Sequence, residues 1–203
     1  MVTALADINA YILNGGQSRR FNMDKSLVQL NGQTLTEIIY QKLGSIFNNI
    51  YIVGKENQFP DFTFIKDIRP VQCQLNGIVT ALEHSHNDWI FVIACDLPVV
   101  ETSSINDLYD NINSNTQVVL PNVNDNLQPL CAFYHKSVLK IFNAAIGIGD
   151  YSLMKLLDQI EVVKVIIPSE DEEQFLNINY PEDLKKAEDL INLENTKWTL
   201  FKT

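Results

Sequence analysis

The stretch Trp89–Cys95, WIFVIAC, is the sequence feature that most limits what this chain can fold into. It is apolar on both faces of a strand, which is typical of the buried centre of a parallel sheet. Such a sheet needs helices on both of its faces. Shorter apolar runs at Ala10–Leu13, Ile50–Val53 and Phe62–Ile65 predict three more strands, and helical spacing predicts helices over 34–47 and 75–83. The alternation predicts an α/β fold with a mostly parallel, Rossmann-like central sheet.

The second half of the chain has a less regular pattern. We expect strands over 117–120 and 130–134, joined across a polar turn at 122–126, and a further strand over 162–167. Helical spacing predicts helices over 138–145 and 152–157, and a serine at 103 or 104 begins one that runs to 113. Pro181 with acidic neighbours marks the start of a last helix, 181–190. The sequence does not indicate whether the tail, 192–203, packs on the body or on a partner.

The composition of the chain argues against some classes of function. The 203 residues are 46% apolar and 20% charged, which is ordinary for a globular protein. The net charge of −10 argues against a nucleic-acid partner, whose binding requires a basic face. No apolar run reaches transmembrane length and the first ten residues lack a signal-peptide pattern, so we expect no membrane partner. The widely spaced Cys73, Cys95 and Cys131 favour reduced thiols in a cytoplasmic protein.

A glycine pair directly after the first predicted strand is the best candidate for a ligand loop. Gly15 and Gly16 lack Cβ atoms, so a ligand can lie against their main-chain N–H groups. Arg19, Arg20 and Lys25 follow within ten residues, and Arg and Lys are the usual partners of phosphate. The loop therefore favours a polyphosphate ligand. The alternative is an ordinary turn with solvated cations.

Two carboxylates follow other predicted strands. Asp67 comes after the strand 62–65, and Asp96 comes directly after the strand 89–95. Ligands of parallel sheets bind beyond the carboxyl ends of the strands, so Gly15, Asp67 and Asp96 are expected in one shared site. A carboxylate at Asp96 can hold Mg²⁺ while the metal bridges phosphate oxygens. The alternative is an aspartate that caps a turn before Pro98.

Residues 13–25, LNGGQSRRFNMDK, resemble the L-A-G-G-x-S-x-R-M-G-x-D-K signature of nucleotidyltransferases, most closely that of the molybdenum cofactor guanylyltransferases. Asn14 stands where this family has Ala, and Asn22 where it has Gly. Asn tolerates positive φ, so Asn22 can keep the bend. Asn14 is the departure that would alter the nucleotide fit. The resemblance implies a three-layer α/β/α fold of the nucleotide-diphospho-sugar transferase type, in one domain over residues 1–203.

Further segments agree with the same family. C-D-x-P at Asp96 matches its metal-binding aspartate, and Asp67 precedes a segment, 73–78, that aligns with G-P-L-A-G-I. In that segment Cys73-Gln74 replaces Gly-Pro and Asn76 replaces Ala. Residues 175–184 match F-x-N-I-N-T-P-E-D-L at the pterin side of the cleft; the alternative is that Asn179 caps the last helix. Gly54 stands nearest the place of a family Asn that meets the nucleotide, so we expect that contact to be lost.

The resemblance implies roles for these positions. The nucleotide-binding half, about 1–100, would contact the nucleotide, and the acceptor-binding half, about 101–191, would contact the acceptor through Asn177 and Asn179. Asp96 would bind Mg²⁺ and, with Arg20 and Lys25, form the catalytic set. The expected nucleotide-binding residues are Leu13, Asn14, Gly15, Gly16, Lys25, Asp67, Gly77 and Asp96.

The implied reaction transfers GMP from GTP to molybdopterin, giving molybdopterin guanine dinucleotide and pyrophosphate. GTP, molybdopterin or the molybdenum cofactor, and Mg²⁺ are the expected ligands, and other cofactor-biosynthesis or molybdoenzyme-maturation proteins are possible partners. One alternative is a related transferase that uses CTP or a sugar or alcohol phosphate. Relatives that use CTP tend to have Ala at the first Gly of the pair, so Gly15-Gly16 favours GTP. A second alternative is a nucleotide-binding homologue without catalysis.

Overall fold

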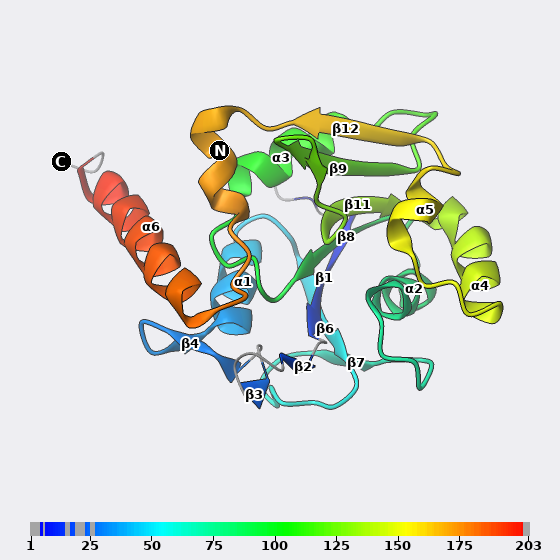
Figure 1. The fold of residues 1–203 in the computed structure, drawn as a ribbon, viewed down its shortest axis with the longest axis horizontal. Helices are drawn as coiled ribbons and strands as arrows, with labels where there is room; N and C mark the ends of the chain where they lie inside the picture. Colours follow the sequence, from blue (N-terminus) through cyan, green and yellow to red (C-terminus); the bar gives the residue numbers. More distant parts are fainter. Residues whose placement is uncertain (1–4, 6, 15–16, 19–22, 25–26, 201–203) are drawn as a thin grey trace.

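The computed structural model describes residues 5, 7–14, 17–18, 23–24 and 27–200. Its centre is an 8-stranded sheet in the order β10-β9-β11-β8-β1-β6-β7, with β12 paired to β9 (Figure 1). The strands of this sheet are β1 Asn9–Asn14, β6 Asn49–Gly54, β7 Phe64–Lys66, β8 Trp89–Ala94, β9 Val118–Val123, β10 Asn126–Leu127, β11 Cys131–His135 and β12 Val162–Ile166.

The centre of the sheet is parallel, as the apolar run at 89–95 predicts. β1 lies between β6 and β8 and runs parallel to both, and β7 extends the parallel set beyond β6. β11 is antiparallel to β8 and β9, while β12 is parallel to β9. The fold is therefore the mostly parallel α/β sheet expected from the sequence.

Helices cover both faces of the sheet. The helices are α1 Leu35–Leu43, α2 Gln74–His84, α3 Thr102–Asp110, α4 Leu139–Gly147, α5 Leu153–Leu157 and α6 Pro181–Leu200, with short 3-10 helices η2 Lys136–Val138 and η3 Ser169–Phe175. The side chains of β1 alternate between two cores. Ala10 and Ile12 pack in the core under α1 and α3, whereas Tyr11 and Leu13 pack in the core under α2, α4 and α5. This alternation gives the three layers seen in Figure 1.

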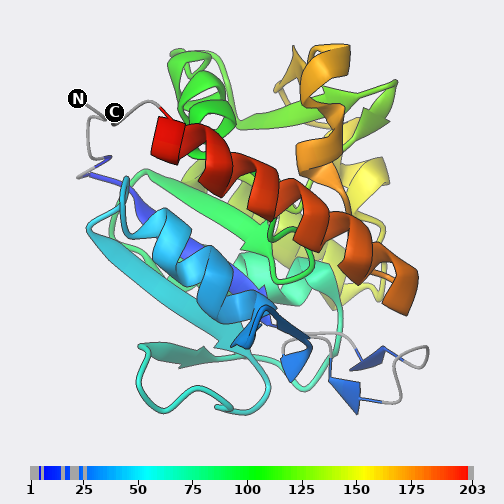
Figure 2. The same ribbon diagram turned by 90° about the vertical axis from the view of Figure 1, so that its left-hand side faces the viewer.

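The last helix, α6, lies on the α1 side of the sheet (Figure 2). A third apolar cluster holds its first half there: Ala187 and Ile178 are buried with Leu35 of α1 and Val28. The cluster fixes the segment before α6, which contains the predicted acceptor residues, to the body of the protein.

A tight hairpin and a capping box precede α1. Asn31 and Gly32 both have positive φ, 51° and 82°, and join the two-residue strands β4 Gln29–Leu30 and β5 Gln33–Thr34 as a tight hairpin. Thr34 caps α1: its hydroxyl accepts from the Glu37 N–H at 3.2 Å, and the Glu37 carboxylate accepts from the Thr34 N–H at 2.7 Å. This is a capping box.

Several element boundaries differ from the predicted ones. The helix α1 ends at Leu43, before the predicted Phe47, because Gly44 ends it and Ile46 and Phe47 fill the core from a turn. β9 runs past Leu120 to Val123, and the hairpin at Asn124 and Asp125, both with positive φ, leads into β10 and not directly into β11. Two short strands, β2 Gln17–Ser18 and β3 Met23–Asp24, were not predicted.

Within the described ranges, no helix has the length and hydrophobicity needed to cross a membrane. Cys73, Cys95 and Cys131, all of which the structure describes, form no disulfide.

Gly54 ends β6 at a position with no room for a side chain. A Cβ atom at this residue would lie 2.4 Å from the main-chain oxygen of Asn14, its partner in β1. Gly147 at the end of α4 is the opposite case, because a Cβ atom there would meet nothing within 4 Å.

We expect Gly54→Ala to lower the free energy of unfolding by about 1–3 kcal/mol, because a buried backbone atom must move to make room. Gly147→Ala is the matched control and should leave stability unchanged or raise it by about 0.5 kcal/mol. Urea unfolding of both variants measures the difference. Equal stability of the two variants would contradict the close approach of β6 and β1.

Candidate functional site

The carboxyl ends of the parallel strands meet at one edge of the sheet. Asn14 and Gly54 are paired at the ends of β1 and β6. The N–H of Asp67 donates to the Gly54 carbonyl at 2.8 Å, and the N–H of Cys95 donates to the Leu13 carbonyl at 3.2 Å. These two hydrogen bonds extend the hydrogen-bond pattern of the sheet to Asp67, a predicted site residue, and to Cys95, which directly precedes Asp96. The edge therefore brings together segments that are far apart in the chain.

Asp67 is half-buried at this edge. Its Oδ1 atom is buried and accepts no hydrogen bond from the described residues. Burial raises the pKa of the Asp67 carboxyl, and a hydrogen bond with the Thr80 side chain opposes this increase. A partly desolvated carboxylate with an unused acceptor atom can accept a hydrogen bond from a ligand.

Asn14 has a buried and unused acceptor as well. Its side chain is 8% exposed, and its Oδ1 atom has no hydrogen-bond partner among the residues that the structure describes. The neighbouring Leu13 is buried on the opposite face of β1 and packs against Gly77 of α2. A Cβ atom at Gly77 would lie 3.1 Å from a Leu13 methyl carbon. Gly77 thus allows α2 to approach the end of β1 closely, and the helix begins at Gln74, three residues before Gly77.

The turn after β8 places Asp96 next to the predicted acceptor segment. Within this turn the Leu97 N–H donates to the Ala94 carbonyl at 3.3 Å. The Lys42 ammonium of α1 donates to the Pro98 carbonyl at 3.1 Å. The Ile178 N–H donates to the Asp96 carbonyl at 2.9 Å. This last bond joins the C-D-x-P turn directly to the N-I-N segment.

The acceptor segment is held by the start of α6. The carboxylate of Asp183 accepts from the N–H groups of Asn179 and Tyr180 at 2.9 Å and 2.8 Å. At the start of α6, the side chain that accepts these main-chain hydrogen bonds is therefore that of Asp183. The Asn177 amide donates to the Phe175 carbonyl at 3.4 Å. Both Asn177 and Asn179 are half-buried, beside Asp96.

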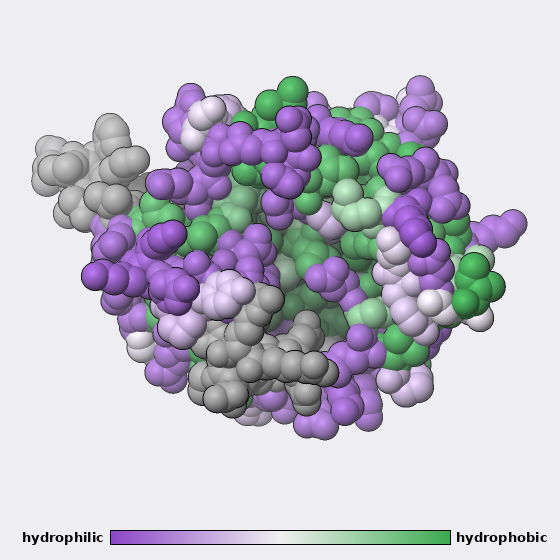
Figure 3. Space-filling view, in the orientation of Figure 1, coloured by the Kyte–Doolittle hydropathy of each residue, from purple (hydrophilic) through white to green (hydrophobic). Residues whose placement is uncertain are grey.

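Four predicted site residues lie outside the described part of the chain. They are Gly15, Gly16, Arg20 and Lys25 of the glycine loop. The space-filling view shows a hollow on the face of the molecule between the side of α1 and α6 and the side of α2 (Figure 3). Hydrophobic residues form its floor and hydrophilic residues its rims.

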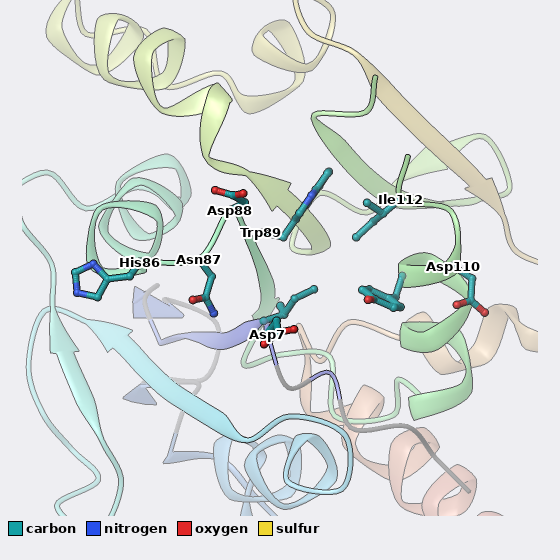
Figure 4. Close-up of a pocket in the computed structure, with 9 residues that line it drawn as sticks. Asp7, His86, Asn87, Asp88, Trp89, Asp110 and Ile112 are labelled. Atoms are coloured by element: carbon teal, nitrogen blue, oxygen red, sulfur yellow. The ribbon is translucent and has the colours of Figure 1, made fainter. Parts of the chain in front are cut away.

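A separate pocket of about 660 Å³ lies at the opposite, amino-terminal edge of the sheet (Figure 4). It contains no residue predicted for the site. Asp88 at its rim forms an ion pair with Lys136, which lowers the pKa of that carboxyl. The pocket is lined by Asp7, Ile8, His86, Asn87, Asp88, Trp89, Tyr109, Asp110 and Ile112.

Sequence reasoning missed two polar residues of α2 that contact the segment after Asp67. Thr80 accepts from the Ile68 N–H at 3.2 Å, and Asn76 donates to two carbonyls of the same segment. The available signal was their spacing: Asn76 and Thr80 are four residues apart in an otherwise apolar helix.

The chain has clear relatives. A model of the MobA-like NTP transferase domain matches residues 10–165. A probable molybdenum cofactor guanylyltransferase of Aquifex aeolicus is 30% identical over 196 residues, which are 95% of this chain and 94% of that protein. The molybdenum cofactor guanylyltransferase of Campylobacter jejuni is 29% identical over 185 residues, 90% of this chain and 96% of that protein.

Solved structures agree with the sequence matches. Molybdopterin-guanine dinucleotide biosynthesis protein A from Archaeoglobus fulgidus superposes with a TM-score of 0.79 at 27% identity, over 91% of this chain and 99% of that chain. The fold and the sequence resemblance therefore lead to the same conclusion, and this chain belongs to the MobA-like NTP transferase family.

Proposed function

We propose that this protein transfers GMP from GTP to molybdopterin, giving molybdopterin guanine dinucleotide and pyrophosphate. The observation that carries the proposal is the hydrogen bond between the Ile178 N–H and the Asp96 carbonyl. It puts the expected metal-binding residue and the expected acceptor segment side by side, at the edge of the sheet where Asp67 also lies. The names of the relatives from Aquifex aeolicus and Campylobacter jejuni support the same reaction.

The proposed chemistry needs positioning more than proton transfer. An oxygen of the terminal phosphate of molybdopterin attacks the α-phosphorus of GTP, and the bond to the β-phosphate oxygen breaks to release pyrophosphate. The attacking phosphate is already ionised at neutral pH, so no general base is required. Arg20 and Lys25 would neutralise the phosphate charges, and the amides of Gly15 and Gly16 would donate to phosphate oxygens.

Asp96 would hold Mg²⁺ in this site, where the metal neutralises charge on the phosphate oxygens. Among the described residues, His, Cys, Asp and Glu form no group of three or more that could hold a metal ion. One carboxylate fits Mg²⁺, which proteins usually bind with one or two carboxylates together with substrate phosphates and water.

Asp67 would select the base. A carboxylate can accept from the N1–H and the 2-amino group of guanine together, and the buried Oδ1 of Asp67 is an unused acceptor among the described residues. Cytosine and adenine do not present this pair of donors. We also propose that the protein is cytoplasmic and that it contacts proteins that make or use the molybdenum cofactor.

GTP with Mg²⁺ should raise the melting temperature more than ATP, CTP or UTP, because a ligand at a hundred times its Kd adds about 2.7 kcal/mol of stability. Thermal-shift measurements with the four nucleotides test this. A larger shift with CTP would show that the base assignment is wrong. Nucleotide binding without pyrophosphate release would identify a homologue without catalysis.

Asp67→Asn should abolish the preference for GTP over inosine triphosphate, which lacks the 2-amino group. The wild-type preference should fade as pH falls through the raised pKa of Asp67, at a higher pH than for an ordinary aspartate. Because the folded-state pKa is raised, the ionised carboxylate destabilises the apo protein above that pKa and this penalty disappears as pH falls. Asp67→Asn should therefore be at least as stable at pH 7, with exposed Asp61→Asn as the control.

A variant of Asp96 separates a role in catalysis from a role in capping the turn. Asp96→Asn keeps the size of the side chain and removes the charge, so turnover should fall by about 100-fold or more, and raised Mg²⁺ should recover part of it. Stability of the apo protein should be retained. If Asp96 only caps the turn before Pro98, stability should drop by about 1 kcal/mol and activity should survive. Exposed Asp158→Asn, at the C-cap of α5, provides the matched control for charge removal.

A further inference from the structure

Three polar side chains form a stripe on one face of α2. Asn76, Thr80 and Glu83 are spaced by four and three residues, which places them on the same side of the helix. All three contact the segment that leads from Asp67 to α2, which we call the Asp67 segment, residues 67–73. In Figure 1 this segment runs from β7 to the start of α2.

Asn76 makes the central contact. Its side-chain amide is fully buried, at 0% exposure, and donates to the carbonyls of Arg69 at 3.1 Å and Val71 at 3.0 Å. One amide group thus binds two main-chain carbonyls of a segment that forms neither a helix nor a strand.

Thr80 and Glu83 contact neighbouring residues of the Asp67 segment. The Thr80 hydroxyl accepts from the Ile68 N–H at 3.2 Å and interacts with the Asp67 carboxylate. The Glu83 carboxylate lies 3.6 Å from the Arg69 guanidinium, which donates to Asn143 of α4 at 2.6 Å. The side chains of the stripe therefore fix the segment soon after Asp67, at residues 68, 69 and 71.

Placing polar side chains on this face of α2 lowers the stability of the fold. The remaining buried residues of α2 are mostly apolar, and the Oδ1 atom of Asn76 is buried with no hydrogen-bond partner in the described chain. A buried polar atom without a partner lowers the stability of the fold. An apolar side chain would suit the core better, so the gain from Asn76 lies in the fixed conformation of the Asp67 segment.

We infer that Asn76 and Thr80 are positioning residues that hold the Asp67 carboxylate in its orientation toward the nucleotide base. The inference rests on the proposed function, in which Asp67 selects guanine. The family pattern has Ala in place of Asn76, and Gly-Pro in place of Cys73-Gln74 at the start of the helix. In this chain side-chain hydrogen bonds fix a segment that lacks that rigid dipeptide. Ordering a backbone residue on binding costs conformational entropy, so a segment fixed beforehand binds its ligand more tightly.

The test compares Asn76→Ala with Asn9→Ala. Asn9 is also a buried asparagine, 9% exposed, but it donates to Ser85 at the amino-terminal end of β1. We expect Asn76→Ala to weaken GTP binding about tenfold and to raise KM for GTP while kcat is retained. Asn9→Ala should change neither quantity. In an Asp67→Asn background, Asn76→Ala should have no further effect on GTP affinity, because its effect acts through Asp67.

Hydrogen exchange gives a readout that does not depend on the ligand. The amides of Ile68, Arg69, Val71 and Gln72 should exchange about tenfold faster in Asn76→Ala than in Asn9→Ala. If Asn76→Ala does not fold, Thr80→Val, which keeps the shape and removes the hydroxyl, is measured in the same way. Unchanged exchange, an effect additive with Asp67→Asn, or an equal loss in Asn9→Ala would overturn the inference. If the parent protein shows no preference for GTP, the proposed function fails, and the exchange rates alone decide whether Asn76 fixes the segment.

Discussion

The pairing of β1 with β6 and β8 is the interaction on which the rest of the structure depends. β1 is buried on both faces and at both edges, and its residues alternate between two apolar cores. Because all three strands run in parallel, their carboxyl ends lie at one edge, and the polar residues that follow them are brought into one region. The absence of a side chain at Gly54 belongs to the same constraint, since any Cβ atom there would collide with Asn14.

The second half of the chain contributes to this edge through its last helix. The apolar cluster around Ile178 and Ala187 fixes the start of α6 against α1. The Ile178 N–H then reaches the carbonyl of Asp96, and Lys42 of α1 reaches the carbonyl of Pro98 in the same turn. Apolar packing supplies the free energy of this docking, and the hydrogen bonds set its register. In this way segments from both halves of the chain converge on Asp96.

Much of the architecture could be predicted from local patterns. The apolar run at 89–95 indicated a central parallel strand, because its pattern depends on neighbouring residues alone. The end of α1 at Leu43 and the extension of β9 to Val123 could not be predicted, since packing of Ile46 and pairing with β12 decide them. The resemblance at 13–25 gave the family, which the comparisons confirm.

The sequence by itself determined the order of the main strands and helices, the family, and the residue types available at each strand end. Those properties follow from short-range periodicity and from motifs. Only the tertiary structure decided that Ile178 bonds to Asp96, that Gly77 packs on Leu13, and that the polar stripe of α2 holds the residues after Asp67. Each of these depends on groups from separate elements that meet only when the sheet and its helices pack, so no local pattern of residues encodes them.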